Sequence, residues 1–373
     1  MISEGKIGPS EASAIPTVLL CLNALFAGSL AADYGLNACW LVLLIAGGLT
    51  FVGIFFSAQL MNYYPDKSIV EVSRVVLGPI PGFLVGIIFL NLFLLGSVLF
   101  LRLETDRILT VYLPNTPEFA MSGALVIAGI IGAYIGLEAL ARTAKILIIF
   151  IIISIILPLI MAYNFWNWNN LFPLGGSGLV EITEGGLSMS GMYVEIIILA
   201  VIYPSIKIAS PRALWYPPLL TGVLVNTLVA LFSLLIFSIP ALNETIYPVV
   251  QSARLIYLGR FIQRIDIFFA FFWMIAITLK FTFLFYATNV LLTRLLKLPY
   301  RKPFLIPLGI IVSSLSFIPN NIIESLHLIS DIAWRWNGLL VFSLMLFMLL
   351  VHYLKPQKSS AQDQKRGQSS ETT

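Results

Sequence analysis

The chain has 373 residues, of which 59% are hydrophobic and 11% are charged. Soluble domains carry about 25% charged residues, so this composition excludes an ordinary soluble domain and indicates an integral membrane protein. The net charge of +4 does not indicate nucleic-acid binding. The two cysteines, Cys21 and Cys39, are too few to indicate a disulfide framework. The N-terminus, MISEGKIGPSE, lacks the pattern of a cleavable signal peptide.

Apolar stretches recur along the chain, and about ten of them can cross a bilayer. Every backbone polar group in lipid must be bonded within the protein, and the stretches lack the alternation of a barrel strand. We therefore predict an all-α polytopic membrane protein with one transmembrane domain, residues 1–355, and a disordered cytoplasmic tail, residues 356–373. The predicted helices cover about 11–32, 38–60, 83–111, 119–135, 141–163, 186–203, 217–239, 265–292, 304–317 and 337–354.

The distribution of basic residues predicts the orientation of these helices. With both termini in the cytoplasm, 15 of the 22 lysines and arginines fall on the cytoplasmic side, as the positive-inside rule favours. The exception is the outer loop 240–264, with three arginines. Its part Gln251–Gln263 has amphipathic spacing, and we expect it to form an outer helix that caps the bundle. Asp66–Gly82 is expected to form an interfacial helix followed by a break.

The first and sixth predicted helices contain the features of discontinuous membrane helices. Helix 1 holds Asn23 followed by the small residues Ala27, Gly28 and Ser29, a pattern that helix packing alone also explains. Helix 6 opens with a Gly-Ser-rich run, Gly185–Gly191, and then carries the intramembrane Glu195. This combination favours a ligand-binding site over plain helix packing. In two halves of five helices each, these breaks occupy corresponding positions, as in transporters with a midplane site.

Charged groups inside predicted helices need partners. Lys280 lies near the middle of helix 8, where an ammonium costs at least about 2.5–3.5 kcal/mol. It faces a polar solute or a partner such as Glu195; the alternative is a purely structural, snorkelling lysine. The helix 3 cluster FLRLETDR is expected to form an intrahelical or loop-linked charge network.

No sequence motif indicates catalysis. The chain has no Walker loop, no metal-ligand spacing and no nucleophile elbow, and His327 and His352 are interpreted as structural or solvated. We therefore expect no enzyme activity, no cofactor and no metal site.

Several motifs, in order and spacing, resemble the B-subunit family of spore germinant receptors, which belongs to the amino acid–polyamine–organocation transporter superfamily. In chain order they are Lys6–Glu11 (KIGPSE), Tyr64–Ser68 (YPDKS), Arg102–Pro117 (ending LPNTP), Gly136–Arg142 (GLEALAR), Glu195 with Tyr203-Pro204, and Arg264, Asp266, Trp273 and Lys280. One departure is in helix 1, where Leu22-Asn23 replaces the family's Gly-Ser pair.

The resemblance implies a five-plus-five inverted-repeat, transporter-like fold. It also implies a membrane subunit that binds a nutrient germinant, typically an amino acid, in complex with A-type and C-type subunits in the inner membrane of a spore. An autonomous proton-coupled or facilitative amino acid transporter is a second hypothesis, and a structural anchor without a ligand is a third. The anchor explains neither Lys280 nor Glu195.

We predict that a small zwitterion lies between the breaks in helices 1 and 6, with walls from helices 3 and 8. The predicted contact residues are Asn23, Ala24, Ala27, Gly28, Leu94, Val98, Gly191, Tyr193, Glu195, Thr278 and Thr282. Sodium-coupled relatives of this fold hold a cation between helices 1 and 8. The Lys280 ammonium is expected to replace that ion by bridging helix 8 to backbone carbonyls of helix 1.

Overall fold

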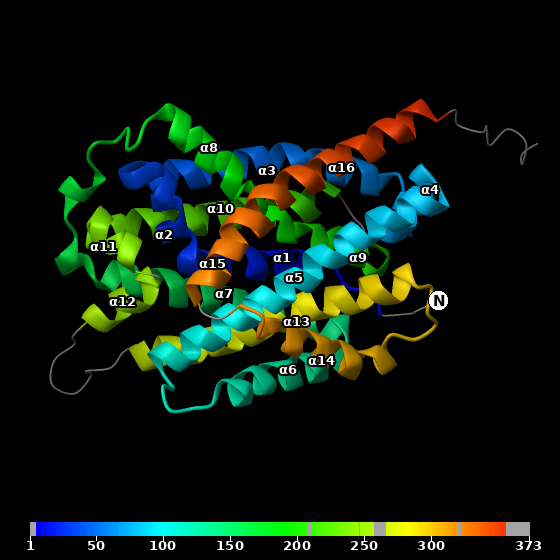
Figure 1. The fold of residues 1–373 in the computed structure, drawn as a ribbon. Helices are drawn as coiled ribbons and strands as arrows, with labels where there is room; N and C mark the ends of the chain where they lie inside the picture. Colours follow the sequence, from blue (N-terminus) through cyan, green and yellow to red (C-terminus); the bar gives the residue numbers. More distant parts are fainter. Residues whose placement is uncertain (1–4, 208–210, 246, 257–265, 320–321, 356–373) are drawn as a thin grey trace, which may run out of the picture.

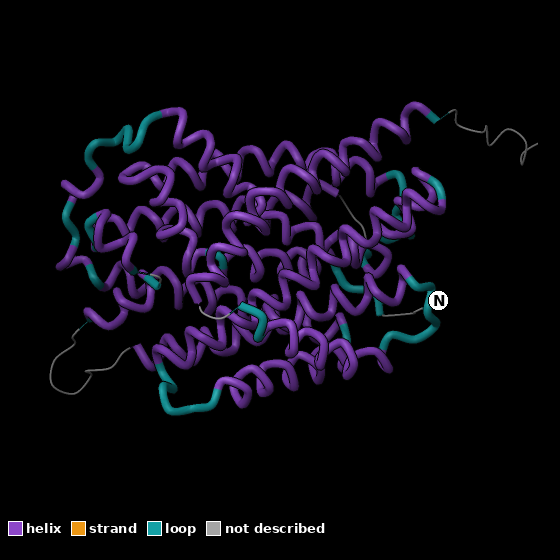
Figure 2. The backbone as a smooth tube through the Cα atoms, viewed as in Figure 1, coloured by secondary structure: helices purple, strands orange, loops and turns teal. Residues whose placement is uncertain are grey.

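The computed structural model describes residues 5–207, 211–245, 247–256, 266–319 and 322–355. Within these ranges the chain is almost entirely helical, and the helices run side by side along one long direction (Figures 1 and 2). Eight described helical stretches are long and apolar enough to cross a membrane, and two shorter apolar helices, Pro9–Leu22 and Lys302–Ser316, accompany them. The fold is therefore that of an all-α polytopic membrane protein.

The α-helices are, in chain order, α1 (Pro9–Leu22), α2 (Ala24–Gly35), α3 (Cys39–Asn62), α4 (Ile69–Leu77), α5 (Pro79–Val111), α6 (Glu118–Ile135), α7 (Leu137–Met161), α8 (Leu179–Met189), α9 (Ile198–Ile202), α10 (Pro211–Ile236), α11 (Ile239–Glu244), α12 (Pro248–Leu255), α13 (Asp266–Leu295), α14 (Leu305–Ser316), α15 (Ile322–His327) and α16 (Arg335–Leu354). Two irregular helices join them at important points: the 3₁₀ segment η4 (Ser190–Ile197) and the π-helical segment η7 (Leu328–Trp334). Shorter 3₁₀ turns cover Leu36–Ala38, Tyr163–Phe165, Trp168–Leu171, Tyr203–Ser205 and Lys302–Phe304.

The two predicted discontinuous helices are interrupted in the structure. The first crossing consists of α1 and α2, which meet at Asn23. The sixth consists of α8, then eight residues of 3₁₀ geometry in η4, then α9. Because 3₁₀ runs longer than three or four residues are uncommon and a mid-helix 3₁₀ stretch often marks a functional hinge, the eight-residue η4 is an unusual backbone element.

Helix α8 begins at Leu179, several residues before the predicted start at Gly186. The sequence predicts a helix break at Gly185 and Gly186, but both residues lie inside α8. A Cβ on Gly185 would come within 2.5 Å of Tyr34, and the Gly186 position is equally close to Ile45. These glycines therefore permit close packing of α8 against the neighbouring helices.

A short elbow joins α4 to α5. The Ser68 backbone N–H donates to the Glu71 carboxylate (2.7 Å) at the start of α4, and Gly78 turns the chain with a φ of +98°. Ser73 Oγ then donates to the Gly82 carbonyl at 2.9 Å. The elbow thus folds α4 back against the first turn of α5.

The described chain begins and ends at the same end of the bundle, as an even number of crossings requires (Figure 1). Helices α11 and α12 lie at the opposite end. Helix α12, Pro248–Leu255, covers only the first part of the predicted outer helix. Residues 257–265, with Arg264, and the predicted tail 356–373 lie outside the described residues.

Candidate ligand site and the buried lysine

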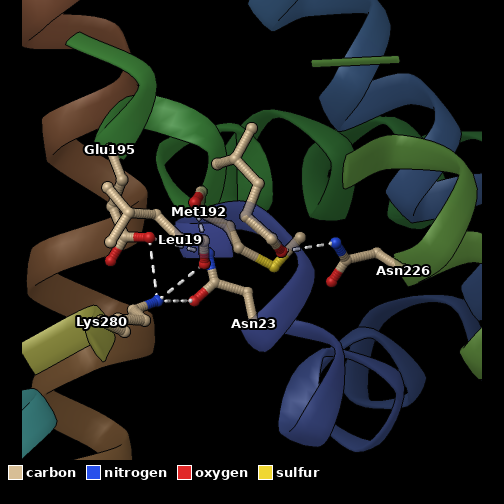
Figure 3. A network of polar contacts seen from close by, with 7 residues as sticks. Leu19, Asn23, Met192, Glu195, Asn226 and Lys280 are labelled. Atoms are coloured by element: carbon tan, nitrogen blue, oxygen red, sulfur yellow. Dashed lines mark hydrogen bonds and ion pairs between the residues drawn. The ribbon is translucent and has the colours of Figure 1, made fainter. Parts of the chain in front are cut away.

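Lys280 on α13 lies at the junction of both interrupted helices (Figure 3). Its ammonium donates to the Leu19 carbonyl (3.0 Å), to Asn23 Oδ1 (2.6 Å) and to Glu195 Oε2 (2.9 Å). An ammonium has three donors, and each has an acceptor here. The Lys280 side chain is 1% exposed and that of Glu195 is 23% exposed. The desolvated cation is therefore offset by one carboxylate and two neutral oxygens.

The break in helix 1 supplies one of these acceptors. The Asn23 N–H donates to the Leu20 carbonyl at 3.3 Å, three residues back. In a regular helix it would donate four residues back, to Leu19. The Leu19 carbonyl is thereby left to accept the Lys280 ammonium. Asn226 of α10 donates to the Leu20 carbonyl at 3.0 Å and secures the other side of the break.

Asn23 ties the two interrupted helices to each other. Its Nδ2 donates to the Met192 carbonyl in η4 (2.9 Å) and to Glu195 Oε2 (3.3 Å), while its Oδ1 accepts from Lys280. Asn23 is 2% exposed. Removal of its amide would leave buried partners unsatisfied, so the side chain links the position of helix 1 to that of helix 6.

A small cavity lies beside this network. Its volume is about 50 Å³, and it is enclosed by α5, η4, α13 and the junction of η7 with α16. The lining residues are Leu92, Phe93, Gly96, Gly191, Val194, Glu195, Leu284, Trp334 and Asn337. Glu195 is the one charged residue among them, and Asn337 adds a neutral amide. The cavity therefore joins a carboxylate, an amide and the irregular backbone of η4 within an apolar wall.

Of the predicted contact residues, Gly191 and Glu195 line this cavity, and Asn23 reaches it through Glu195. The wall from α5 consists of Leu92, Phe93 and Gly96, and Leu94 and Val98 are not part of it. Trp334 and Asn337 on the tenth crossing were not predicted. In the sequence, the lone amide of Asn337 at the start of an apolar stretch is the feature that could have indicated a polar contact there.

The remaining helix 1 and helix 6 candidates pack elsewhere. Ala24 and Ala27 are buried and do not line the cavity. A Cβ on Gly28 would lie 3.4 Å from the Ala230 Cα of α10. Tyr193 is fully buried, and its hydroxyl donates to the Leu43 carbonyl of α3 at 3.5 Å. The small residues of α2 therefore allow close helix packing, the alternative left open from the sequence.

Thr278 and Thr282 also face away from Lys280. Two residues along an α-helix correspond to roughly 200° of rotation, so both threonines occupy the far side of α13. They line a separate apolar groove of about 540 Å³ against α6 and α7. Their hydroxyls donate to the carbonyls of Met274 (2.8 Å) and Thr278 (2.7 Å), four residues back in each case.

Gly191 is a packing position as well as a lining residue. A Cβ there would collide with the carbonyl oxygen of Trp334, and a Cβ on Gly338 would come within 2.7 Å of the Gly191 nitrogen. The 3₁₀ segment and the start of α16 are thus in backbone contact. A bulky residue at Gly191 would disturb this packing as well as the cavity.

The charged cluster of α5 forms the predicted network. Arg102 pairs with Asp106 at 3.1 Å and with Glu118 at the start of α6, and Arg107 pairs with Glu104. The Arg107 guanidinium also lies 5.5 Å from the ring centre of Tyr247 in the outer cap. The Arg102–Glu118 pair joins α5 to the start of α6, and the other two pairs lie within α5.

The described residues give no indication of metal chemistry. Among them, no group of three His, Cys, Asp or Glu side chains could hold a metal ion. His352 Nδ1 is hydrogen-bonded to the Tyr64 hydroxyl at 2.8 Å, which is a structural contact between α16 and the loop after α3.

Solved structures share the fold. Mhp1, a nucleobase–cation–symport-1 family transporter, aligns with a TM-score of 0.66 at 12% identity, covering 91% of this chain and 78% of that one. MhsT in complex with L-phenylalanine aligns with the same TM-score at 15% identity, covering 91% and 89%. At these identities the likeness concerns the fold alone, which is the five-plus-five transporter fold that the sequence predicted.

Sequence relatives are spore germination proteins. Spore germination protein KB of Bacillus subtilis is 23% identical over 333 residues, covering 86% of this chain and 88% of that protein. YndE of the same organism, another spore germination protein, is 23% identical over 289 residues, covering 76% and 78%. The family model described as "Spore germination protein" matches residues 13–325. The chain therefore belongs to the spore germination protein family.

Proposed function

We propose that this protein is the nutrient-binding membrane subunit of a spore germination receptor and that its ligand is a small amino acid. The observation that carries the proposal is the junction at Lys280, where both interrupted helices and α13 meet beside a cavity. Interrupted helices place backbone donors and acceptors at membrane depth, where a zwitterion needs them. The receptor would lie in the inner membrane of the spore, with both termini in the cytoplasm.

The cavity has groups for both ends of a zwitterion. Glu195 Oε2 already accepts hydrogen bonds from Lys280 and Asn23, and a carboxylate has capacity for further donors, so a ligand ammonium can share it. The ligand carboxylate would accept hydrogen bonds from the Asn337 amide and from backbone N–H groups of η4. A volume of about 50 Å³ limits the ligand to a small side chain unless the walls move.

Lys280 would serve as a permanent substitute for a bound cation. Its ammonium is held by oxygens of α1, Asn23 and Glu195, which are the ligand types that an alkali cation would use. The same contacts would transmit ligand binding, because movement of η4 pulls on Asn23 and hence on α1. A-type and C-type subunits would receive that movement at the surface of the bundle.

Filling the cavity tests the ligand site. Gly96 lines the cavity, and its nearest neighbour to an added Cβ is Leu284 at 3.9 Å, so Gly96→Val occupies cavity space without a backbone collision. The matched control is Gly48→Val on α3, where an added Cβ meets nothing within 4 Å. We expect Gly96→Val to weaken binding of labelled alanine or glycine at least tenfold and to abolish the germination response, with the control unchanged.

Binding should be measured on the full chain in liposomes, in sodium and in choline buffer. We expect the same affinity in both, because Lys280 replaces the ion. Strict dependence on sodium would contradict the role of Lys280, and equal binding by Gly96→Val and wild type would contradict the site.

An autonomous transporter is the second candidate, favoured by the fold shared with Mhp1 and MhsT. The same liposomes separate the two. Binding without accumulation of labelled amino acid supports the receptor, whereas concentrative uptake by the chain alone supports the transporter.

A further inference from the structure

A further pocket is lined by residues of the α4–α5 elbow and of the segment after α13, and these elements lie at the end of the bundle where the described chain begins and ends (Figure 1). Its volume is about 470 Å³, and its lining residues are Arg74, Pro79, Ile80, Phe83 and Lys297. Two of these five are cations, three are apolar, and none is acidic. The pocket lies between the α4–α5 elbow and the C-terminus of α13, and the proposed ligand site makes no use of it.

Arg74 is held against the end of α13 by hydrogen bonds to backbone carbonyls. Its guanidinium donates to the Leu295 carbonyl (2.5 Å) and to the Arg294 carbonyl (3.5 Å) at the end of α13. A Cβ on Gly82 would lie 2.5 Å from the Arg74 Cα, so α4 and α5 are in close contact here. The guanidinium therefore remains at the pocket without rearrangement on binding.

Lys297 occupies an unusual backbone position. The Leu298 N–H donates to the Thr293 carbonyl (2.8 Å) and the Lys297 N–H donates to the Arg294 carbonyl (3.3 Å), which is a Schellman motif at the end of α13. Lys297 has a φ of +54°, in the left-handed region where glycine is the usual residue. Its ammonium has no acceptor among the residues that the structure describes. The Lys297 side chain is exposed, so its ammonium is available to an anion at the pocket.

The apolar half of the pocket is exposed on the surface of the bundle. Ile80 is 74% exposed, and Phe83 and Leu84, in the next turn of α5, are 37% and 56% exposed. Helix α4 is short and amphipathic, as interfacial helices are. With α4 at the membrane interface, as the sequence predicts, the two cations would lie at the level of lipid headgroups and the apolar surface at the level of acyl chains.

We infer that this pocket binds an anionic phospholipid. Its phosphate lies between the guanidinium of Arg74 and the ammonium of Lys297, and an acyl chain lies along Ile80 and Phe83. Basic pockets between membrane helices are typical binding sites for anionic headgroups. The apolar wall favours a lipid over free phosphate, which would leave Ile80 and Phe83 uncovered. A bound lipid would connect the interfacial helix α4 to the end of α13, the helix that carries Lys280.

Native mass spectrometry of the full chain in detergent tests this inference. Phosphatidylglycerol and phosphatidylcholine with identical acyl chains are titrated onto the wild type, Lys297→Gly and Lys302→Gln. We expect tighter binding of phosphatidylglycerol by the wild type, and a loss of about fivefold in Lys297→Gly, since each cation near anionic lipid contributes about 1 kcal/mol. Lys302, at the same end of the bundle, lies 4.0 Å from the ring centre of Tyr134 and outside the pocket, so its variant should bind normally.

Thermal unfolding separates this effect from damage to the fold. Glycine suits the left-handed backbone at 297, so Lys297→Gly should unfold in lipid-free detergent at a Tm no lower than that of the wild type. Equal affinity for the two lipids, or unchanged phosphatidylglycerol binding by Lys297→Gly, would overturn the inference. Displacement of the lipid by excess inorganic phosphate would also overturn it, because the pocket would then be a free-anion site.

Discussion

At the scale of single residues, the chemistry of the proposed site depends on one buried cation and the oxygens around it. Lys280 has its full set of acceptors, and Phe100 presents its ring 4.9 Å from the ammonium. Buried ion pairs of this kind contribute little net stability, but loss of one partner leaves an uncompensated charge. The network is therefore better suited to fixing the relative positions of α1, η4 and α13 than to adding stability.

A double-mutant cycle tests this interpretation. Lys280→Met leaves the Glu195 carboxylate without its cation and should cost toward the lower end of roughly 3–5 kcal/mol, because Glu195 is partly exposed. Lys280→Met with Glu195→Gln should recover part of that loss, while the germination response stays absent in both. Stability is measured as thermal unfolding in detergent and function as nutrient-triggered germination. A Lys280→Met protein with a normal response would contradict the proposed role.

We expect that arginine does not replace Lys280. The guanidinium is larger and planar, whereas the Lys280 ammonium fits between three oxygens at 2.6 to 3.0 Å. Lys280→Arg therefore keeps the charge and is expected to lose the germination response, which distinguishes a geometric requirement from a purely electrostatic one.

At the scale of elements, the proposed site is formed where regular helices give way to other geometries. Helix 1 breaks at Asn23, helix 6 contains the 3₁₀ segment η4, and the π-helical segment η7 lies between α15 and α16. Each irregularity changes the direction of side chains that follow it. The cavity lies where η4 and the η7–α16 junction meet, so its shape depends on the contact between these two elements.

Gly191→Ala tests that contact. The added methyl group would collide with the Trp334 carbonyl, and overpacking of this kind typically costs about 1–3 kcal/mol. We expect a lower Tm and weaker amino acid binding, because η4 must move away from α16. Gly48→Ala, in open space on α3, is the control and should be neutral or slightly stabilising. Unchanged Tm and affinity in Gly191→Ala would show that η4 and α16 are not in tight contact.

At the scale of the whole molecule, the bundle separates its loops into two sets. The loop between α7 and α8 and the loop between α13 and α14 lie at opposite ends (Figure 1). The end that holds the second loop carries Arg294, Lys297, Arg301 and Lys302, so the positive-inside rule predicts that this end lies in the cytoplasm. The proposed lipid pocket lies at this same end.

Cysteine labelling tests this orientation. The native Cys21 and Cys39 are both buried and free, so they give little background. Asn169→Cys and Tyr300→Cys introduce thiols at exposed positions of the two loops. In intact cells, a membrane-impermeant maleimide should label the thiol at position 169 and reach that at position 300 only after permeabilisation. Labelling of both from outside would contradict the predicted topology.

The sequence by itself determined the class of the molecule, the interrupted helices and the charged groups that need partners. Hydrophobicity and length decide membrane crossing, because lipid imposes the same requirement on every segment. Lys280 and Glu195 were conspicuous for the same reason, since a charge at membrane depth needs compensation wherever the neighbouring helices lie. Motif order then predicted the family, to which the chain belongs.

Only the tertiary structure decided which residues surround the cavity. The Lys280–Asn23 and Lys280–Leu19 contacts join positions 257 and 261 residues apart, and no local pattern encodes such distances. Thr278 and Thr282 lie on the side of α13 that faces away from the cavity, and Gly28 packs closely against α10. Trp334 and Asn337 entered the site because the backbone of the tenth crossing packs directly on η4. These outcomes depend on how helices dock, and docking is set by the shapes of all the contacting side chains together.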